Sequence, residues 1–442
     1  MMGVSLPIMV GACAQIPKVE RPPNVLLILT DDLRADAIGA SGNSFAHTPN
    51  IDALGRDGIV FPNAFVTTSI CPTSRASILT GEYANRHGMW GFGEYDPDLV
   101  KRSFTTKLRE KGYHSSFIGK WGIGKPIPED VFDFKYTFGN EKRYFSKEYG
   151  DKHLTQHIGD IAVAQINNLP DQPFCMIYST KAPHAQDGDP WPFQPSPDFN
   201  GQYQETDFFL APSVNKESFE NLPDFLKQSE GRRRWEIRFG TQEKAKKSRS
   251  DYYRLVSGID REVGRIIEAL KNKGLYDNTL IIFSSDNGMM LGEHGLSGKW
   301  WMFEESIRIP MIAKAPKGTS FTTDASQQVL NIDICPTILE VCGLTPEDRV
   351  QGKSILSSVT RTKFFYEHLF ENATIVKSEG VRSEDHKYVR YLLDGTYYES
   401  LFDLRADPFE MQDLARDESA REILLDMRET FESLRLEATS PL

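Results

Sequence analysis

A cysteine and an arginine, Cys71 and Arg75, lie four residues apart in the segment Ser-Ile-Cys-Pro-Thr-Ser-Arg-Ala-Ser-Ile-Leu-Thr-Gly. The apolar residues that follow predict that a short loop ends here at the start of a helix. A sulfur atom at that place would lie near the positive end of the helix dipole, with a fixed cation one turn further on. This environment suits a nucleophile that meets an anionic substrate. A buried structural cysteine explains these two residues equally well.

Two pairs of oxygen-bearing side chains directly follow apolar runs: Asp31 with Asp32, and Asp286 with Asn287. Adjacent carboxylates repel each other unless a cation holds them. Three carboxylates and an amide oxygen, without cysteine or histidine ligands nearby, favour a hard divalent ion such as Ca²⁺ or Mg²⁺. Helix N-capping explains either pair alone at least as well, but two such pairs in one chain favour the metal.

Three further segments contribute cationic side chains. Lys120 lies in the glycine-rich segment Gly-Lys-Trp-Gly-Ile-Gly, His184 follows Ala-Pro, and Gly-Glu-His-Gly-Leu-Ser-Gly-Lys holds His294 and Lys299. Any one of them alone is more often a surface or capping residue. Together with Arg75 they could surround a tetrahedral oxyanion beside a divalent ion.

Three continuous apolar runs predict strands that are buried on both faces of a parallel sheet. They cover residues 23–30, 174–178 and 278–284, and the clearest helical pattern between them covers residues 252–273. Strands that alternate with helices predict an α/β fold with a large, mostly parallel sheet between helices. Ligands of such sheets gather at the carboxyl ends of the strands. Because all three runs end in polar, reactive residues, we expect the site at that edge.

Beyond residue 316 the pattern changes to a helix-like stretch and then to short alternating segments that predict a small antiparallel sheet. The helix-like stretch covers residues 332–344, the alternating segments cover 364–367, 380–382, 387–393 and 397–403, and a closing helix covers about 419–438. We therefore expect a catalytic domain over residues 22–345. A C-terminal subdomain of four antiparallel strands and a helix would cover residues 346–442.

The composition argues against some classes of function. The chain has 51 lysine and arginine residues against 62 aspartate and glutamate residues, a net charge of −11 that disfavours nucleic-acid binding. The only dense basic cluster lies within residues 227–249, and a solvated helical face explains it better than a binding patch. The five cysteines are widely spaced and make no disulfide framework.

The N-terminal segment points to export. No stretch reaches the roughly eighteen apolar residues that a membrane span needs. In residues 1–13, a run of small residues directly precedes Cys13. This pattern resembles the end of a bacterial lipoprotein signal, whose cysteine is lipidated. We expect residues 1–21 to direct a bacterial protein to the periplasm or the cell surface, with a lipid anchor at Cys13 as one form of that export.

Taken in order, these motifs resemble those of the type I sulfatases of the alkaline-phosphatase superfamily, and bacterial carbohydrate sulfatases and arylsulfatases in particular. The resemblance covers about residues 22–415. The matching segments are Pro-Asn-Val-Leu-Leu-Ile-Leu-Thr-Asp-Asp, Thr-Pro-Asn-Ile-Asp-Ala-Leu, Cys71 with Ser-Arg-Ala-Ser-Ile-Leu-Thr-Gly, Gly-Lys-Trp, Ala-Pro-His, Ser-Asp-Asn-Gly, Gly-Glu-His-Gly-Leu with Gly-Lys, Glu-Glu with Arg-Ile-Pro, and Leu-Phe-Asp-Leu with Asp-Pro and Glu410.

The resemblance implies an alkaline-phosphatase-like fold and a sulfuric ester hydrolase. A formylglycine-generating enzyme or an anaerobic maturase would convert Cys71 into formylglycine, which persists as a gem-diol bound to Ca²⁺, with Mg²⁺ the less favoured ion. The other metal ligands would be Asp31, Asp32, Asp286 and Asn287.

The resemblance also implies a role for each remaining site residue. One hydroxyl of the gem-diol would attack sulfur, with Asp286 as the acceptor of its proton, while Arg75 orients the gem-diol. His184 or His294 would protonate the leaving alcohol, and collapse of the hemiacetal sulfate would release sulfate. The residues that would bind the sulfate oxygens are Lys120, His184 and Lys299.

The similarity to polysaccharide-degrading sulfatases implies a sulfated carbohydrate substrate. Candidate sugar contacts are the aromatic and basic residues within 187–235, together with Glu367, His368 and Arg382 from the predicted C-terminal sheet. Surface or interdomain packing explains each of them about as well.

The chain departs from the family pattern at two positions. The third place of the nucleophile motif, usually Pro or Ala, is Thr73, and the histidine that usually follows Lys-Trp is replaced by Gly122. Two alternatives therefore stay open: a phosphomonoester or phosphonate hydrolase on the same scaffold, and a catalytically silent protein that binds sulfated glycans.

Overall fold

The computed structural model describes residues 21–93, 95–124, 129–139, 141–356, 360–370 and 372–440. Residues 1–20, which include Cys13 and almost all of the expected export segment, lie outside the described residues, so that expectation stays a prediction. Within the described ranges, no helix is long and apolar enough to cross a membrane.

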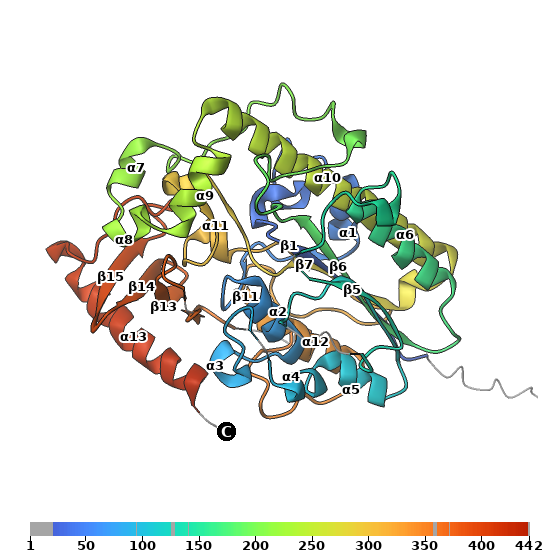
Figure 1. Ribbon diagram of the computed structural model, residues 1–442. Helices are drawn as coiled ribbons and strands as arrows, with labels where there is room; N and C mark the ends of the chain where they lie inside the picture. Colours follow the sequence, from blue (N-terminus) through green and yellow to red (C-terminus); the bar gives the residue numbers. More distant parts are fainter. Residues whose placement is uncertain are drawn as a thin grey trace, which may run out of the picture.

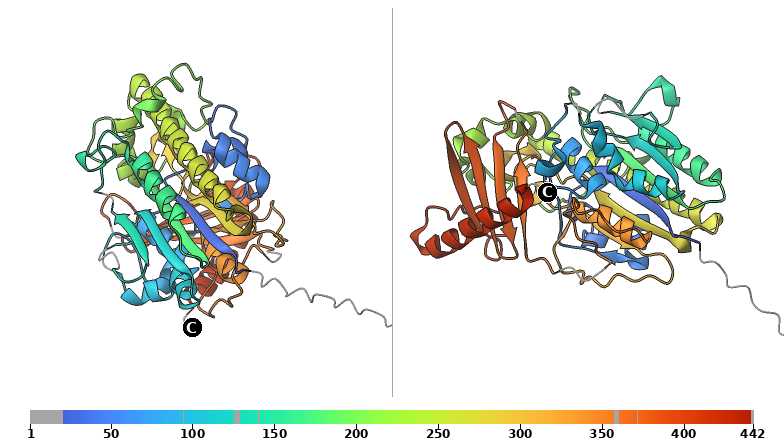
Figure 2. Two further views of the ribbon diagram at one scale, coloured as in Figure 1. Left: turned by 90° about the vertical axis from the view of Figure 1, so that its right-hand side faces the viewer. Right: turned by 90° about the horizontal axis from the view of Figure 1, so that it is seen from below.

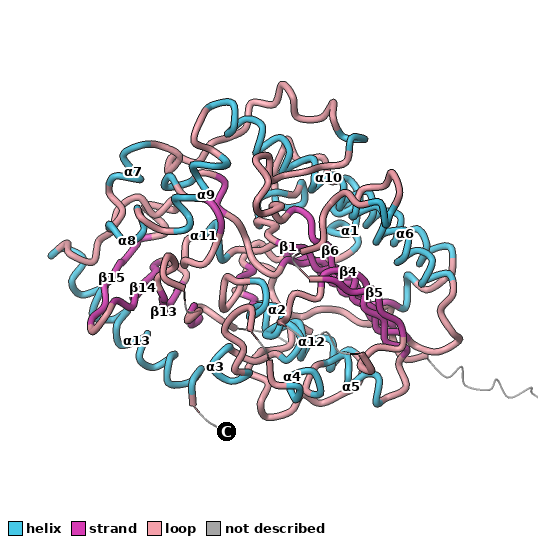
Figure 3. Tube along the Cα trace, viewed as in Figure 1, coloured by secondary structure: helices cyan, strands magenta, loops and turns pink. Residues whose placement is uncertain are grey.

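A seven-stranded sheet lies at the centre of the described structure (Figures 1 and 3). Its strands are β1 (Asn24–Asp31), β2 (Ile59–Val60), β4 (His114–Lys120), β5 (Phe134–Phe138), β6 (Phe174–Pro183), β7 (Thr279–Ser285) and β10 (Met311–Lys314). The order is β2-β10-β7-β1-β6-β4-β5; the five strands from β7 to β5 run parallel, and β10 is antiparallel to both of its neighbours. All three predicted strands belong to this sheet, and the expected mostly parallel α/β fold is confirmed.

The central strand β1 contributes side chains to two hydrophobic cores. Val25, Leu27 and Leu29 pack in one core, and Leu26 and Ile28 pack in the other. Because a strand with helices on both faces buries every side chain, its sequence is a continuous apolar run rather than an alternating one. The helices lie on both sides of the sheet (Figure 2). The first core includes residues of α2 (Cys71–Thr80), α5 (Phe104–Glu110) and α12 (Ile334–Val341), and the second includes residues of α1 (Pro49–Asp57), α6 (Leu154–Asn167) and α10 (Gln242–Asn272).

Three elements differ most from the prediction. α10 begins at Gln242, ten residues before the predicted start, where the hydroxyl of Thr241 accepts the N–H of Lys244 at 3.2 Å. Its first turns are rich in polar residues, so the apolar period begins only further along. β6 continues to Pro183, five residues beyond the predicted end, because the buried polar residues Ser179, Thr180 and Lys181 interrupt the apolar run but not the strand. The helix predicted over 332–344 is a 3-10 turn (Asn331–Asp333) followed by α12.

The C-terminal part forms a second sheet with one helix beside it, as predicted. Strands β12 (Lys363–His368), β13 (Lys377–Ser383), β14 (His386–Leu393) and β15 (Thr396–Asp403) are antiparallel in sequence order, and α13 (Arg421–Thr439) packs against them. The right-hand view of Figure 2 shows this sheet at one side of the larger body. The boundary near residue 345 stays a prediction.

Short elements lie in the loops between these parts. They are α3 (Ala84–His87), α4 (Pro97–Lys101), α7 (Lys216–Glu220), α8 (Asp224–Lys227), α9 (Glu230–Arg238), α11 (Glu304–Ile307), the parallel pair β3 (Ala64–Phe65) and β11 (Val329–Leu330), and the antiparallel pair β8 (Met290–Leu291) and β9 (Ser297–Gly298).

Buried ion pairs connect α11 to the C-terminal sheet. Lys387 Nζ lies 2.8 Å from Glu304 Oε1 and 2.8 Å from Glu410 Oε1, and Arg382 Nε donates to Glu304 Oε1 at 3.2 Å. Burial alone would raise the pKa of Glu304, but Lys387 and Arg382 outweigh it and hold that pKa below its usual range. Lys387 is therefore the cation shared by two buried carboxylates.

Replacement of Lys387 by methionine is expected to lower the free energy of unfolding by about 3–5 kcal/mol, because two carboxylates would stay buried without their shared cation. Denaturant titration measures the loss. The exposed ion pair of Arg405 with Asp385, at the edge of the same sheet, provides the matched control. Arg405→Met should cost less than about 1 kcal/mol, and equal losses in the two variants would contradict this role of Lys387.

Candidate active site

The ends of five strands and the first half of one helix bring nine predicted site residues together. All nine are buried. They are Asp31 and Asp32 at the end of β1, Lys120 at the end of β4, His184 after β6, Asp286 and Asn287 after β7, Cys71 and Arg75 in α2, and Lys299 after β9.

Cys71 is the first residue of α2, as predicted, and is 1% exposed. Its Sγ donates to Asp31 Oδ1 at 3.2 Å and accepts from Lys299 Nζ at 2.8 Å. Burial, and then the carboxylates of Asp286 and Asp31, raise the pKa of the Cys71 thiol well above its ordinary value. A thiol that is held protonated is a poor nucleophile. Unmodified Cys71 is therefore poorly suited to attack a substrate.

Three carboxylates around Cys71 each have a cationic partner. Burial alone would raise the pKa values of Asp31 and Asp32, but the neighbouring lysines outweigh it and hold both below their ordinary value. Burial, and then the charge of Asp31, raise the pKa of Asp286 to about 6. Asp286 is therefore the carboxylate that takes up a proton most readily. The three ion pairs are Asp31 with Lys120, Asp32 with Lys299, and Asp286 with Arg75.

The donor set fits a divalent cation. Asn287 Nδ2 donates to Asp32 Oδ1 at 2.6 Å, yet its buried Oδ1 has no hydrogen-bond partner in the described part of the chain. An amide oxygen that is buried without a partner is costly unless something binds it. One ligand atom each from Asp31, Asp32, Cys71 and His184 lies within 4.8 Å of all the others. Carboxylate and amide oxygens in this number are typical ligands of a hard ion.

The ring of His184 is oriented by its backbone neighbours. Nδ1 donates to the carbonyl oxygen of Ala185 at 2.6 Å, so Nε2 faces Asp32 Oδ2 at 3.7 Å. The hydroxyl of Tyr144 donates to the carbonyl oxygen of His184 at 2.6 Å. Burial lowers the pKa of His184 to about 4, so the ring is neutral at pH 7, with its proton on Nδ1.

Arg75 is held by several hydrogen bonds and keeps one donor free. Its Nε donates to Asp286 Oδ2 at 2.7 Å, and its Nη1 donates to the carbonyl oxygen of Lys120 at 2.8 Å and to Ser179 Oγ at 2.7 Å. Nη2 is buried, and no described residue accepts from it. Ser179 is not among the residues predicted from the sequence, although it is the first polar residue after a predicted buried strand, as Asp31 is.

The glycine that replaces the usual family histidine lies against Arg75. Gly122 has a φ of +71°, and a Cβ atom there would lie 2.9 Å from Arg75 Cδ and 3.3 Å from Lys120 Cε. A side chain at this position would therefore strain the backbone and require Arg75 to move. The observed position of the Arg75 side chain therefore leaves room for glycine, but not for a larger residue, at position 122.

Comparison with known proteins agrees with this geometry. The family model for sulfatases matches residues 23–344. The chain belongs to the sulfatase family. A second model, described as the C-terminal part of N-sulphoglucosamine sulphohydrolase, matches residues 292–437 of this sulfatase. The expected family and the expected enzyme class, a sulfuric ester hydrolase, are confirmed.

The sulfatase is similar to a carbohydrate sulfatase, to a structure solved with a sulfated sugar, and to a phosphonate monoester hydrolase. It is 27% identical to an N-acetylglucosamine-6-O-sulfatase of Bacteroides thetaiotaomicron, over 91% of this chain and 85% of that protein. A structure solved in complex with its substrate D-glucosamine-2-N,6-O-disulfate has a TM-score of 0.77 at 23% identity, covering 95% and 98% of the two chains. A phosphonate monoester hydrolase of Silicibacter pomeroyi has a TM-score of 0.79 at 21% identity, covering 94% and 96%. Both structural matches show a common fold.

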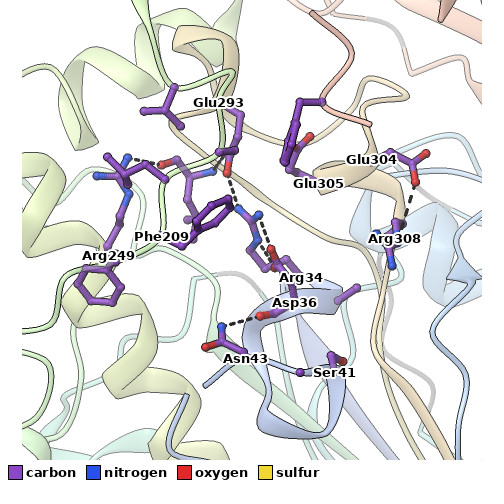
Figure 4. A pocket seen from close by; sticks show the side chains of 18 of the residues that line it. Arg34, Asp36, Ser41, Asn43, Phe209, Arg249, Glu293, Glu304, Glu305 and Arg308 are labelled. Carbon is purple, nitrogen blue, oxygen red and sulfur yellow. Dashed lines mark hydrogen bonds and ion pairs between the residues drawn. The ribbon is translucent and has the colours of Figure 1, made fainter. Parts of the chain in front are cut away.

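His294 lies in a turn next to the nine residues. Its ring stacks on Phe303 with the ring centroids 4.6 Å apart. The backbone N–H of His294 donates to the carbonyl oxygen of Ser213 at 2.8 Å. The preceding Glu293 lines a cavity of about 400 Å³, where it accepts from Arg34 Nη1 at 2.7 Å (Figure 4). Among the described residues, no hydrogen bond or ion pair joins the His294 side chain to the nine, and its catalytic role stays a prediction.

The three predicted sugar contacts lie in or against the C-terminal sheet. Glu367 accepts the backbone N–H of Asn85 at 3.0 Å, and Arg382 pairs with Glu304. His368 is buried, and within the described chain neither of its ring nitrogens has a hydrogen-bond partner. Two of the three therefore have polar partners already, and only His368 has unused polar atoms.

Proposed function

We propose that this sulfatase hydrolyses a sulfate ester on a sulfated carbohydrate, with a formylglycine made from Cys71 as the nucleophile and Ca²⁺ as the metal. The state of Cys71 is the observation that carries this proposal. Its thiol is buried and held protonated, yet it lies between Asp31 and Lys299 at the centre of the charged site. A formylglycine at the same position could react, with Asp31 and Lys299 beside it, whereas the protonated thiol is a poor nucleophile there.

The surrounding residues have suitable positions for the reaction. A formylglycine at position 71 would supply the nucleophilic hydroxyl, and a divalent ion held by Asp31, Asp32, Asp286 and Asn287 would stabilise the charge that develops. Asp286, to which the family resemblance assigns this role, would accept a proton from that hydroxyl. Arg75 holds Asp286, and its buried Nη2 has no partner among the described residues and is available to a ligand, while Lys120 and Lys299 would donate to the sulfate oxygens. His184 would have to gain a proton on Nε2, which the negative charge of the bound sulfate favours, in order to donate to a sulfate oxygen and then protonate the leaving alcohol. His294 is the other candidate for that proton.

The relatives support a carbohydrate substrate. One of them is named for N-acetylglucosamine 6-O-sulfate, and a protein of the same fold was solved with a disulfated glucosamine. Glu367, His368 and Arg382 stay our candidates for contacts with the sugar, and the unpartnered ring of His368 is the first to test. The phosphonate monoester hydrolases share the fold, so phosphonate esters belong in the same test.

Maturation and export are parts of the same proposal. Because Cys71 is 1% exposed in the fold, a formylglycine-generating enzyme or an anaerobic maturase must act before the chain closes around it. Thr73 occupies the third motif position inside α2, so this maturase must accept threonine there. We place the mature protein in the periplasm or at the cell surface of a bacterium.

Release of inorganic sulfate tests the proposal. The substrates are sulfated mono- and oligosaccharides that differ only in sulfate position, together with a phosphonate monoester and a phosphomonoester. Protein co-expressed with a maturase should release sulfate, and protein without formylglycine should not. Faster turnover of the phosphorus esters would assign the protein to the other hydrolase class. Glycan binding without turnover, in protein shown to contain formylglycine, would make it a silent homologue.

Binding of Ca²⁺ is expected to stabilise the fold, by about 2.7 kcal/mol at a concentration 100 times its Kd. The reason is that the ion binds the orphan amide oxygen of Asn287 only in the folded state. Thermal unfolding with and without Ca²⁺ measures the increment. Asn287→Leu should lose most of it, whereas Asn50→Leu, which removes an amide bonded to Asp260, should keep it. An increment unchanged in Asn287→Leu would contradict this metal site.

A further inference from the structure

Two arginines of the basic cluster are not solvated, so for them the expected solvated helical face is wrong. Arg234 and Arg238 lie in the last two turns of α9. Arg238 is 3% exposed, and the side chain of Arg234 is 18% exposed. Buried guanidinium groups need anionic or polar partners. Their partners therefore indicate what these two residues are for.

The carboxylate that the two arginines share is Asp187, at longer distances, and Arg234 has a second anionic partner, because its Nε donates to Glu230 Oε1 at 2.8 Å. Arg238 Nη2 lies 3.3 Å from Asp187 Oδ1, and Arg234 Nη2 lies 3.5 Å from Asp187 Oδ2. Arg238 Nη1 also donates to Ser297 Oγ at 3.3 Å. Charge-assisted hydrogen bonds between such groups are usually 2.7–2.9 Å long. The side chain of Asp187 is 55% exposed, so it can leave this position for water.

This cluster lies next to the sulfate-binding residues. Asp187 follows His184 by three residues, and Ser297 precedes Lys299 by two. The guanidinium of Arg234 stacks over the ring of Trp300, which follows Lys299, at 4.9 Å from its centroid. Although burial alone would raise the pKa of Asp187, positive charges led by Arg234 and including Arg238 and Lys299 outweigh it and lower that pKa. The positive field of the site therefore extends to this carboxylate.

We propose that Arg234 and Arg238 form a second anion subsite beside the sulfate that is hydrolysed, and that Asp187 occupies this subsite in the free enzyme. The ligand is a sulfated sugar that carries a second anionic group, a sulfate or a carboxylate, on the same or the adjoining ring. Guanidinium forks bind such groups through paired hydrogen bonds. On binding, the second group displaces Asp187. The inference rests on the proposed function, because the first sulfate must lie at Lys299 and His184.

The test compares two sugars that differ in their second charge, N-acetylglucosamine 6-O-sulfate and D-glucosamine-2-N,6-O-disulfate. Arg234→Gln and Arg238→Gln should lower kcat/KM for the disulfate by about ten- to a hundredfold, the effect of one lost charge-assisted contact. The monosulfate should change less than about twofold. Asp187→Asn should act in the opposite direction and lower KM for the disulfate, because the competing carboxylate is gone.

Further variants provide a control and a second test in case one variant does not fold. Arg233→Gln, at an exposed position of the same helix, should alter neither substrate. If Arg238→Gln fails to fold, Arg234→Gln and Asp187→Asn still give opposite expected signs. Equal losses on both sugars in the arginine variants, or a loss rather than a gain in Asp187→Asn, would overturn the subsite.

Calorimetry with Cys71→Ala separates this inference from the proposed function. If matured wild-type protein releases no sulfate from any sugar, the proposed function fails. In that case, tighter binding of the disulfate than of the monosulfate, with the difference lost in Arg234→Gln, would support the subsite. Equal binding of the two sugars would overturn it.

Discussion

Replacement of Cys71 by alanine is expected to lower sulfate release by about 10⁴-fold or more, because the proposed nucleophile is made from this side chain. The remaining charges would still bind sulfate, so binding of a sulfated sugar should survive. The fold should also survive, since the Cys71 thiol donates one bond, to Asp31, and accepts one, from Lys299. The matched control is Cys175→Ala, which removes a buried thiol from the core of β6 and should leave kcat unchanged.

Mass spectrometry of the peptide that contains Cys71 gives the second measurement. Active protein should show the mass change that accompanies replacement of CH₂SH by CHO, and a hydrazide probe should label it at that residue alone. Activity in Cys71→Ala above about a hundredth of wild type would contradict the role of this side chain. An active wild-type protein that carries an unmodified thiol would contradict its conversion.

The position of the site could be predicted from the sequence because of how parallel sheets are built. Asp31, His184 and Asp286 each follow or end a buried apolar run, and the carboxyl ends of parallel strands meet at one edge. Cys71 was located by the same local reasoning, from the apolar residues that continue as α2. These inferences needed only the pattern around each residue.

Contacts between distant segments could not be predicted in this way. Arg234 belongs to a run of charged residues that has the pattern of a solvated helix, and only the fold brings Asp187 and Trp300 to it. Ser179 has a local signal, since it follows a predicted strand, but the hydrogen bond that it accepts from Arg75, 104 residues away, depends on the fold. Gly122 departed from the family pattern in the sequence, but the reason for glycine there, the approach of Arg75, depends on the fold.

Replacement of Lys299 by methionine is the second change for which we expect a large effect, a fall of about 10²–10³-fold in kcat, the usual result of removing one donor to a developing oxyanion. Lys299 Nζ lies 2.8 Å from Cys71 Sγ and is also paired with Asp32, so its charge lies beside the atom that becomes the nucleophile. Its neighbouring carboxylates, Asp32 first, outweigh burial and raise the pKa of this lysine, so it stays charged throughout the working pH range.

A second buried lysine separates the catalytic effect from the cost of burial. Lys314 lies in β10, and its Nζ donates to the carbonyl oxygen of Tyr276 at 2.6 Å, with no part in the charged cluster. Lys314→Met should lower the free energy of unfolding yet keep kcat within about twofold, whereas Lys299→Met should lower kcat even where both variants remain folded at the assay temperature. If Lys299→Met raised KM and left kcat unchanged, the ammonium group would bind substrate and transition state equally, which would contradict its role in stabilising the charge that develops on sulfate.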